Sequence, residues 1–280
     1  MITPAEEDFI KSVAYVPEHM PGYGTAISGG ETFLLENYTC YREKEFLIFI
    51  GYPFQEPFDE TKMEKILAAA IKRFTPSRVA LIAPSISRRD GERGDSDAYY
   101  QLDLEILKIP AKVRNMIHRA SQELQVKKGR EFLGEHRRLV EDFLQMRQVS
   151  EGTHTIFQKI QEYLASVPTA WIFSARAGDG RLVGFDIAEF GAKNYAFYMF
   201  NFRSSQNAAP GTSDLLLYEL IQTAKQQGKR FVNLGLGVNA GVTFFKRKWG
   251  GRPFLDHEFI LFEPRKISPF EALLQGFLRR

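Results

Sequence analysis

YAFYMFNFRSSQNAAPGTSDLLLYELIQTAKQQGKRFVNLGLG, residues 195–237, is the stretch that decides the fold of this protein. It opens with a run of aromatic residues, a composition that favours a buried strand. A polar loop containing Pro210 and Gly211 follows, and a helix is predicted from Ser213 to Gln227. Residues 229–234 predict a second strand. The stretch therefore predicts a strand, a loop, a helix and a further strand in succession.

Strands and helices are also predicted on both sides of this unit. After it come a short helix at Ala240–Trp249 and a last strand at Pro253–Phe262. Before it, helices are predicted near 110–122, 134–148 and 153–166, and strands at 169–176, 181–190 and 194–202. The C-terminal SPFEALLQGFLRR places its apolar residues on one helical face.

The N-terminal part shows a similar order. The predicted segments are a short helix at 4–13, a Gly/Pro-rich loop PEHMPGYG, strands near 31–41 and 45–52, a helix from about Glu60 to Phe74 capped by Asp59 or Thr61, a strand at Arg78–Ala83, an exposed loop at 87–97 and a closing strand at 99–109. Neither part shows the regular strand–helix alternation of a doubly wound sheet. We therefore expect an α+β protein with two copies of one fold, over residues 1–109 and 110–280.

Composition limits the classes of function. The 280 residues carry a formal charge of +3, which gives no general reason to expect DNA binding. The only cysteine is Cys40, so an internal disulfide and a cysteine-based zinc site are excluded. The histidines show no metal-ligand spacing, and no metal is expected. With neither a signal peptide nor a long apolar run, we expect a cytoplasmic protein without a transmembrane segment.

Two basic zones lie within this nearly neutral chain. Residues 246–252 contain Lys246, Arg247, Lys248 and Arg252, next to apolar residues. The other zone, residues 112–138, carries eight Lys and Arg residues. Each zone is either a solvated surface or a binding site for phosphate groups, and the longer one would suit the phosphates of tRNA.

Residues 150–262 resemble the GNAT (Gcn5-related acyltransferase) fold, in the variety found in Fem-type peptidoglycan peptidyltransferases. The resemblance rests on the aromatic strand with its loop and helix, on the glycine-bearing strand FVNLGLG, and on the phrase FFKRKWGGRP. KIPAKVRNMIHRA, residues 108–120, is similar to the helix that precedes the second domain of tandem GNAT proteins. The resemblance implies tandem GNAT-like domains, each a mixed, mostly antiparallel sheet flanked by helices, with residues 30–107 in the first copy.

The resemblance also implies a reaction, namely transfer of an acyl group from acyl-CoA, such as acetyl-CoA, to the amine of a small molecule or peptide. The backbone of Phe200, Asn201 and Phe202 would polarise the donor carbonyl. Arg203, Gly211, Thr212 and Ser213 would bind the pyrophosphate at the helix N-terminus, and Asn239 lies beside the same cleft. Lys246 would hold the acceptor or act as acid, and Glu189, with Asp186 as the alternative, would act as base.

Two other functions stay open. The loop Gln206–Gly211 has a single glycine and a proline where acetyl-CoA enzymes carry a glycine-rich motif, and Lys246 replaces their usual tyrosine. Fem-type proteins have a lysine there, so aminoacyl-tRNA is the alternative donor and tRNA the alternative partner. A GNAT-like binding module without catalytic activity is the third hypothesis. The sequence does not indicate an oligomeric state.

Overall fold

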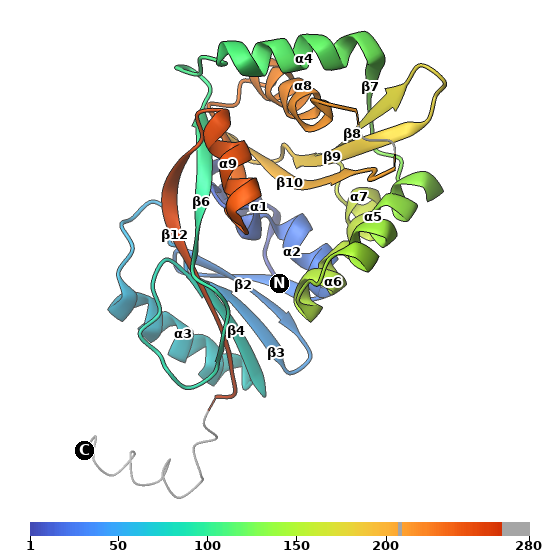
Figure 1. Cartoon of the computed structure of the whole chain (residues 1–280). Coiled ribbons are helices and arrows are strands. Elements are labelled where there is room, and N and C mark those ends of the chain that lie inside the picture. Colours follow the sequence, from blue (N-terminus) through green and yellow to red (C-terminus); the bar gives the residue numbers. More distant parts are fainter. Residues whose placement is uncertain (207–208, 265–280) are drawn as a thin grey trace, which may run out of the picture.

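One continuous mixed sheet runs through the protein (Figure 1). The structure is a computed structural model and describes residues 1–206 and 209–264, so the helix predicted at the C-terminus lies outside the described residues. The strands are β1 (Glu31–Leu35), β2 (Tyr38–Glu43), β3 (Phe46–Ile50), β4 (Arg78–Ala83), β5 (Glu92–Arg93), β6 (Asp97–Asp103), β7 (Leu124–Gly129), β8 (Ala170–Ala177), β9 (Leu182–Glu189), β10 (Tyr195–Arg203), β11 (Phe231–Leu236) and β12 (Arg252–Phe262). Their order is β1-β2-β3-β4-β12-β6-β11-β10-β9-β8-β7, with β5 against β12.

The last strand, β12, joins the two parts of the sheet. Its first half, Arg252–His257, pairs with β6, and its second half, Glu258–Phe262, pairs with β4. On its other edge β6 pairs with β11. The strand predicted to close the first part therefore lies among the strands of the second part. A division of the chain into domains at residue 110 stays a prediction.

The helices cover the sheet in layers. They are α1 (Pro4–Val13), η1 (Pro17–His19), α2 (Pro21–Ser28), α3 (Glu60–Phe74), α4 (Ala111–Glu123), α5 (Gly134–Met146), α6 (Glu151–Gln158), α7 (Ile160–Ser166), α8 (Thr212–Gln226) and α9 (Ala240–Lys248). In the second part, α4 and α8 pack on the face that carries Phe173 and Val183. Helices α5 and α7 pack on the opposite face, with Ile172 and Phe185. Alternation along the strands thus builds two cores, one on each face.

The first part of the sheet has its own core, and the N-terminal segment lies between the two parts. Helix α3 buries Met63 and Leu67 against strands β3 and β4. Residues 14–24 lie between this part and the second one, where Val16 packs with Tyr52 and Tyr99. Figure 1 shows α1 and α2 at this junction, below α8 and above α3.

The predicted α+β class and its mixed, mostly antiparallel sheet are confirmed. Local boundaries differ in several places: the strand predicted at 99–109 is β6, the loop predicted at 87–97 contains β5, and the helix predicted at 153–166 is divided into α6 and α7. The strand predicted at 31–41 is a hairpin of β1 and β2, residues 124–129 form the unexpected strand β7, and the loop PEHMPGYG forms η1 and the start of α2. Pro17 and Pro21 start these two helical segments, because proline suits the first helical turn. The loop prediction was therefore wrong, because it took prolines that begin helices as a sign of a loop.

Candidate functional site

Strands β10 and β11 separate from each other part of the way along their length. They pair in parallel through only three residue pairs, of which Phe197 and Asn233 are the last. Beyond this point β10 stays with β9, and β11 stays with β6. The resulting gap, bordered by residues 198–203 of β10 and 234–236 of β11, is called here the β10–β11 opening.

The backbone of β10 lines one side of this opening. Phe200, Asn201 and Phe202 pair with β9 on their other side, after a bulge at Met199. In such an edge strand, alternate amides point away from the paired neighbour. They therefore point toward the opening, as the predicted role in polarising a carbonyl requires. The side chains of Phe200 and Phe202 are buried in the core beneath α5 and α7, so only their backbone is available.

Lys246 of α9 reaches the other side of the opening. Its side chain is buried, with 3% of the residue exposed, and its Nζ donates a hydrogen bond to the carbonyl of Leu236 on β11. A Cβ added to Gly235 would lie 3.6 Å from both this Nζ and the carbonyl oxygen of Tyr198. Gly235 therefore leaves room between the lysine and β10. Burial lowers the pKa of Lys246 to about 7, and the Asp97 carboxylate opposes this shift.

The turn that carries Lys246 toward the opening is fixed by Asp97, at the start of β6. Its carboxylate accepts hydrogen bonds from the backbone amides of Gly237 and Val238, at 3.0 and 2.7 Å. Two residues of this turn have positive φ, Gly235 at 76° and Val238 at 58°. Asn239 then caps α9 by accepting from the amides of Gly241 and Val242. The predicted cleft residue Asn239 is thus occupied as a helix cap.

A chain of hydrogen-bonded polar side chains, of which Asp186 is fully buried, runs from α8 to β9 beside the opening. Ser213 Oγ donates to Asn201 Oδ1 at 3.2 Å, and Asn201 Nδ2 donates to Asp186 Oδ1 at 2.5 Å. Burial raises the pKa of Asp186 well above its ordinary value, and the Asn201 amide opposes this shift. Two of the predicted residues, Asn201 and Ser213, therefore contact each other, and their hydrogen bonds are used within the protein.

The N-terminus of α8 is occupied by its own side chains and by α4. A Cβ on Gly211 would lie 2.7 Å from the carbonyl oxygen of Met116 in α4. Thr212 Oγ1 donates to the carbonyl of Ala209. Asp214, in the first helical turn, accepts hydrogen bonds from Lys248 and from the buried Trp249. This turn thus already carries a buried carboxylate, which offsets the positive end of the helix that a bound anion would use.

Glu189 lies on the opposite face of β9 from Asp186 and is fully buried. Its Oε2 accepts from the Tyr163 hydroxyl at 2.7 Å, and its Oε1 accepts from the Gly191 amide at 2.8 Å. Burial raises its pKa, while these hydrogen bonds lower it. Both carboxylate oxygens are therefore engaged, and the structure does not bring Glu189 together with Lys246.

The predicted basic zones contribute unequally to the surface. In the shorter zone Lys246 is buried and Lys248 pairs with Asp214, whereas Arg247 and Arg252 are exposed. The exposed residues of the longer zone include Lys112 and Arg119 on α4, and this helix contacts Gly211. Arg203 is exposed at the end of β10.

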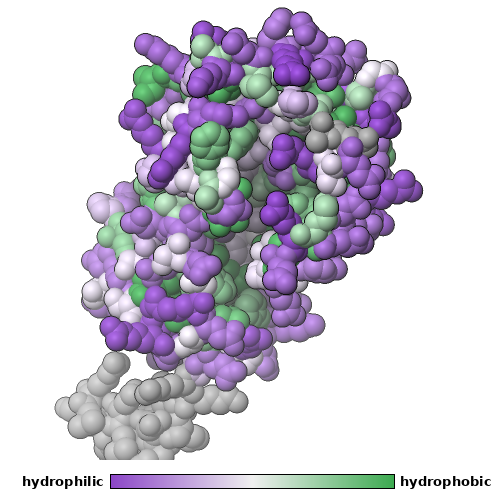
Figure 2. All heavy atoms as spheres, in the orientation of Figure 1, coloured by the Kyte–Doolittle hydropathy of each residue, from purple (hydrophilic) through white to green (hydrophobic). Residues whose placement is uncertain are grey.

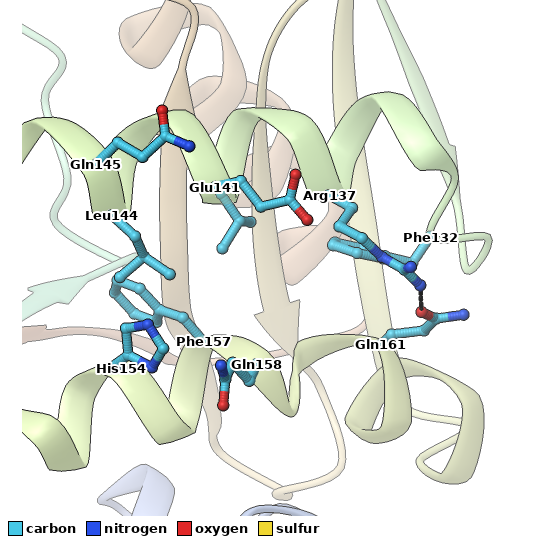
Figure 3. Close-up of a pocket in the computed structure, with 10 residues that line it drawn as sticks. Phe132, Arg137, Glu141, Leu144, Gln145, His154, Phe157, Gln158 and Gln161 are labelled. Atoms are coloured by element: carbon cyan, nitrogen blue, oxygen red, sulfur yellow. Dashed lines mark hydrogen bonds between the residues drawn. The ribbon is translucent and has the colours of Figure 1, made fainter.

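A separate cavity of about 350 Å³ lies between α5 and the α6–α7 helices (Figure 3). Its wall includes the apolar Leu144 and Phe157 together with Arg137, Glu141 and His154. The Arg137 guanidinium donates to Gln161 (Figure 3). None of the residues predicted for catalysis or donor binding lines this cavity.

Sequence reasoning missed two carboxylates near the opening. Asp97 was placed in an exposed loop, although its pairing with the backbone of 237–238 positions Lys246. Glu18 was placed in the PEHMPGYG loop, although its Oε2 is buried. Glycine and proline around Glu18 hid the relevant signal, since burial at a junction of distant strands has no local pattern.

The sheet is mixed, and it separates between two parallel strands that flank a helix in sequence. This arrangement defines a GNAT-like fold, and here a buried lysine lies at the gap. Solved structures share this fold. FemX superposes with a TM-score of 0.63 at 9% identity, over 100% of this chain and 99% of that chain. L-PGS from Bacillus licheniformis has a TM-score of 0.59 at 17% identity, over 99% and 98%.

A GCN5-related N-acetyltransferase from Kribbella flavida has a TM-score of 0.52 at 12% identity, over 89% of this chain and 95% of that chain. No family model matches the sequence, and no curated protein matches it either. The predicted resemblance to GNAT-like proteins of the Fem type is therefore confirmed at the level of fold. Among the described residues, no helix has the length and apolar character needed to cross a membrane.

Proposed function

We propose that this protein is an acyltransferase that moves an acyl or aminoacyl group from an activated ester or thioester to an amine in the β10–β11 opening. The observation that carries the proposal is the position of Lys246, whose buried Nζ bonds to the carbonyl of Leu236 on β11. A Cβ on Gly235 would meet both this Nζ and the carbonyl oxygen of Tyr198 on β10. A buried cation at a gap in a sheet has little structural reason to be there, because apolar packing would be more stable.

Lys246 has the properties of a proton donor for the leaving group. With a pKa of about 7, it is partly protonated and partly neutral near neutral pH. A general acid is most effective when its pKa lies near the working pH. The ammonium group would also stabilise the negative charge that develops when the donor carbonyl is attacked, together with the β10 amides that point toward the opening.

The α8 N-terminus supports aminoacyl-tRNA rather than acyl-CoA as the donor, which we propose although acyl-CoA was the first expectation from sequence. A pyrophosphate needs free amides and positive charge, whereas Asp214 places a buried carboxylate in that turn and α4 covers Gly211. The exposed Lys112 and Arg119 of α4, beside the loop that ends at Gly211, suit the phosphates of tRNA.

Two labelled donors test the proposal. The protein is incubated with a pool of tRNA carrying tritiated amino acids, or with radiolabelled acetyl-CoA, together with small-molecule and peptide amines. We expect label to pass from tRNA to an amine, and tRNA binding to weaken steeply with added salt. The variant Lys246→Met should bind tRNA as wild type does but transfer label at least 100-fold more slowly.

Other outcomes assign the function differently. Transfer from acetyl-CoA, with thermal stabilisation by that compound, would make coenzyme A the carrier and leave the acyltransferase proposal standing. Transfer from neither donor, with no binding of tRNA or acetyl-CoA, would overturn the proposal and favour a GNAT-like binding module.

A further inference from the structure

The N-terminal segment is attached at the point where β10 and β11 separate. The side chain of Asn233 donates from Nδ2 to the carbonyl of Tyr15 at 2.9 Å. Met20 packs in one apolar cluster with Phe197. Asn233 and Phe197 are the last paired residues of the two strands. The turn between Tyr15 and Met20, which contains Glu18, therefore lies over the inner end of the opening.

Hydrogen bonds with the first part of the sheet hold this turn in addition to the bond from Asn233 in the second part. The hydroxyl of Tyr41, on β2, donates to the carbonyls of Glu18 and Met20 at 2.7 and 3.1 Å. His19 Nδ1 accepts a hydrogen bond from the backbone amide of Tyr15, at 3.5 Å. The ring proton is therefore on His19 Nε2, which donates to the carbonyl of Tyr52 at 2.9 Å. Burial lowers the pKa of His19 to about 3, which keeps its ring neutral. The position of Glu18 is thus fixed by groups other than its own side chain.

The side chain of Glu18 lacks the partners that a structural carboxylate normally has. Its Oε2 is buried and makes no hydrogen bond within the described residues, and the same holds for the hydroxyl of Tyr99. Tyr99 is the side chain that interacts with the Glu18 carboxyl. Buried polar atoms without partners are rare, and each needs an explanation. Two such atoms side by side form a site for a group that both donates and accepts hydrogen bonds, as an amine does.

The sheet register relates this pair to Lys246. Tyr99 of β6 lies opposite Leu236 of β11, and the carbonyl of Leu236 accepts the hydrogen bond from Lys246. Tyr99 and Leu236 belong to the apolar cluster formed with the N-terminal segment, whereas Tyr100 and Trp249 pack on the α8 side of the sheet. Glu18 and Lys246 therefore flank the opening from opposite faces of the sheet.

From this geometry we propose that Glu18 is the general base that removes the proton from the acceptor amine, and that the acceptor enters from the face covered by residues 14–24. The inference rests on the proposed acyltransferase function and names the side from which its acceptor comes. In the space-filling view the surface is hollowed between the two parts of the molecule, with apolar residues in its depth (Figure 2).

The step balances with these two groups. The nitrogen lone pair of the amine attacks the donor carbonyl carbon and forms the C–N bond, while the Glu18 carboxylate takes one proton from that nitrogen. The C–O bond to tRNA, or the C–S bond of a thioester, then breaks, and the leaving atom takes a proton from the Lys246 ammonium. Glu18 ends protonated and Lys246 neutral, and one proton returns from Glu18 to Lys246 through solvent.

The surroundings of Glu18 suit a base that works near neutral pH. Burial raises its pKa to about 7, and the Glu18 backbone and the nearby Tyr99 hydroxyl oppose this shift. The ionisable groups facing it from neighbouring elements are Tyr23 of α2, Tyr41 of β2, Tyr52 after β3 and Tyr99 of β6. All four are phenols whose own pKa values burial raises, so they stay neutral, and within the described part of the chain no cation holds the Glu18 carboxylate ionised.

The test compares Glu18→Gln with Glu189→Gln in the labelled transfer assay from pH 5 to 9. Glu189 is the matched control, because it is a buried glutamate whose oxygens are already bonded to Tyr163 and Gly191. For wild type we expect a bell-shaped rate with a maximum near pH 7. Glu18→Gln should lower kcat about 100-fold, leave the KM of the donor unchanged and abolish the rise of rate on the acid side. Glu189→Gln should keep that rise.

A chemical rescue separates a base from a structural residue. Added formate should raise the transfer rate of Glu18→Ala at least tenfold. It should not change the rate of Lys246→Met. If wild type is active and Glu18→Gln has the same rate and the same pH dependence, the role of Glu18 is overturned while the proposed function stands. An inactive wild type would overturn the proposed function and this inference together.

Discussion

Two strand–helix–strand units in this protein share one design but end differently. In the first, β3 and β4 flank α3 in sequence and pair in parallel through five residue pairs, and the amide of Gly51 extends the ladder to Ile82. In the second, β10 and β11 flank α8 and pair through three. The first unit is a closed piece of core, and the second holds an opening at the same place along its strands.

The difference lies in the groups that meet where the strands end. In the first unit, Gly51 is packed tightly, since a Cβ there would lie 2.6 Å from the Met63 sulfur and 2.7 Å from Ala83. In the second unit, a bulge at Met199 and the positive φ of Gly235 turn the two backbones apart, and Asp97 holds the turn there. Apolar packing closes one pair of strands, whereas polar anchoring keeps the other open. The closed unit therefore provides a structural control for each change in the open one.

The largest expected effect is that of Lys246→Met in the open unit. Loss of the ammonium group removes both the proton donor and the positive charge, so we expect kcat to fall about 10³-fold, or about 4 kcal/mol of transition-state stabilisation. Methionine fills a similar volume, and the fold should persist. Steady-state rates of transfer measure the effect. A loss smaller than threefold would show that the opening works without Lys246.

The same variant should be more stable than wild type, with a characteristic pH dependence. Burial lowers the pKa of Lys246 from 10.5 to about 7, so the unfolded chain binds more protons between these values. Wild-type stability therefore rises with pH from 7 to 10.5, and the deficit is largest below pH 7. In urea unfolding, the free energy of unfolding of Lys246→Met should exceed that of wild type by a few kcal/mol at pH 6.5 and by less at pH 10. A constant difference between these pH values would contradict the lowered pKa.

In the closed unit, Leu67→Ala should affect stability alone. Leu67 is fully buried between α3 and the strands β3 and β4, and its truncation leaves a cavity that costs about 3 kcal/mol. We expect the midpoint of urea unfolding to fall accordingly, while kcat measured well below the melting temperature stays within twofold of wild type. A large fall in kcat for the folded variant would mean that the closed unit also takes part in the reaction.

The sequence predicts the two units well and their difference poorly. Both helices and all four strands follow from local patterns, and Asp59 caps α3 as predicted. Lys246 was selected through the phrase it shares with Fem-type proteins, and the structure places it at the β10–β11 opening. The turn before its helix, however, is held by Asp97, which is 149 positions away from Lys246 in sequence. Contacts of that range carry no periodic signal.

The choice of a base shows the same limit. Glu189 was selected because the strand that carries it supplies a base in related enzymes, yet its oxygens are bonded to Tyr163 and Gly191. Glu18, in a segment predicted as a loop, has an oxygen with no partner among the described residues. Which carboxylate is saturated and which is free depends on side chains from distant strands and helices, and such side chains cannot be paired from spacing.

A smaller effect is expected for Gly235→Ala, with Gly228→Ala as its control. The two glycines have φ of 76° and 69°, so alanine strains both by a similar amount, about 1 kcal/mol. At Gly228 the new Cβ meets nothing within 4 Å, whereas at Gly235 it lies 3.6 Å from Lys246 Nζ and Tyr198 O. We expect equal losses of stability but a roughly tenfold loss of kcat/KM only for Gly235→Ala. Equal activity of the two variants would place the reaction elsewhere.

The smallest effect compares an aspartate at the start of each unit's helix. Asp59 caps α3 by accepting from the Lys62 amide, and asparagine is an equally good cap, so Asp59→Asn should change stability by a few tenths of a kcal/mol. Asp214 instead binds Lys248 and Trp249 and so fastens α9, which carries Lys246, to α8. Asp214→Asn keeps an acceptor for the indole but loses the ion pair, and should cost about 1 kcal/mol. Because Asp97 still holds the turn at the other end of α9, kcat should fall less than threefold. If kcat instead falls as far as in Lys246→Met, then the anchor on α8, rather than the Asp97 turn, sets the position of the lysine in the opening.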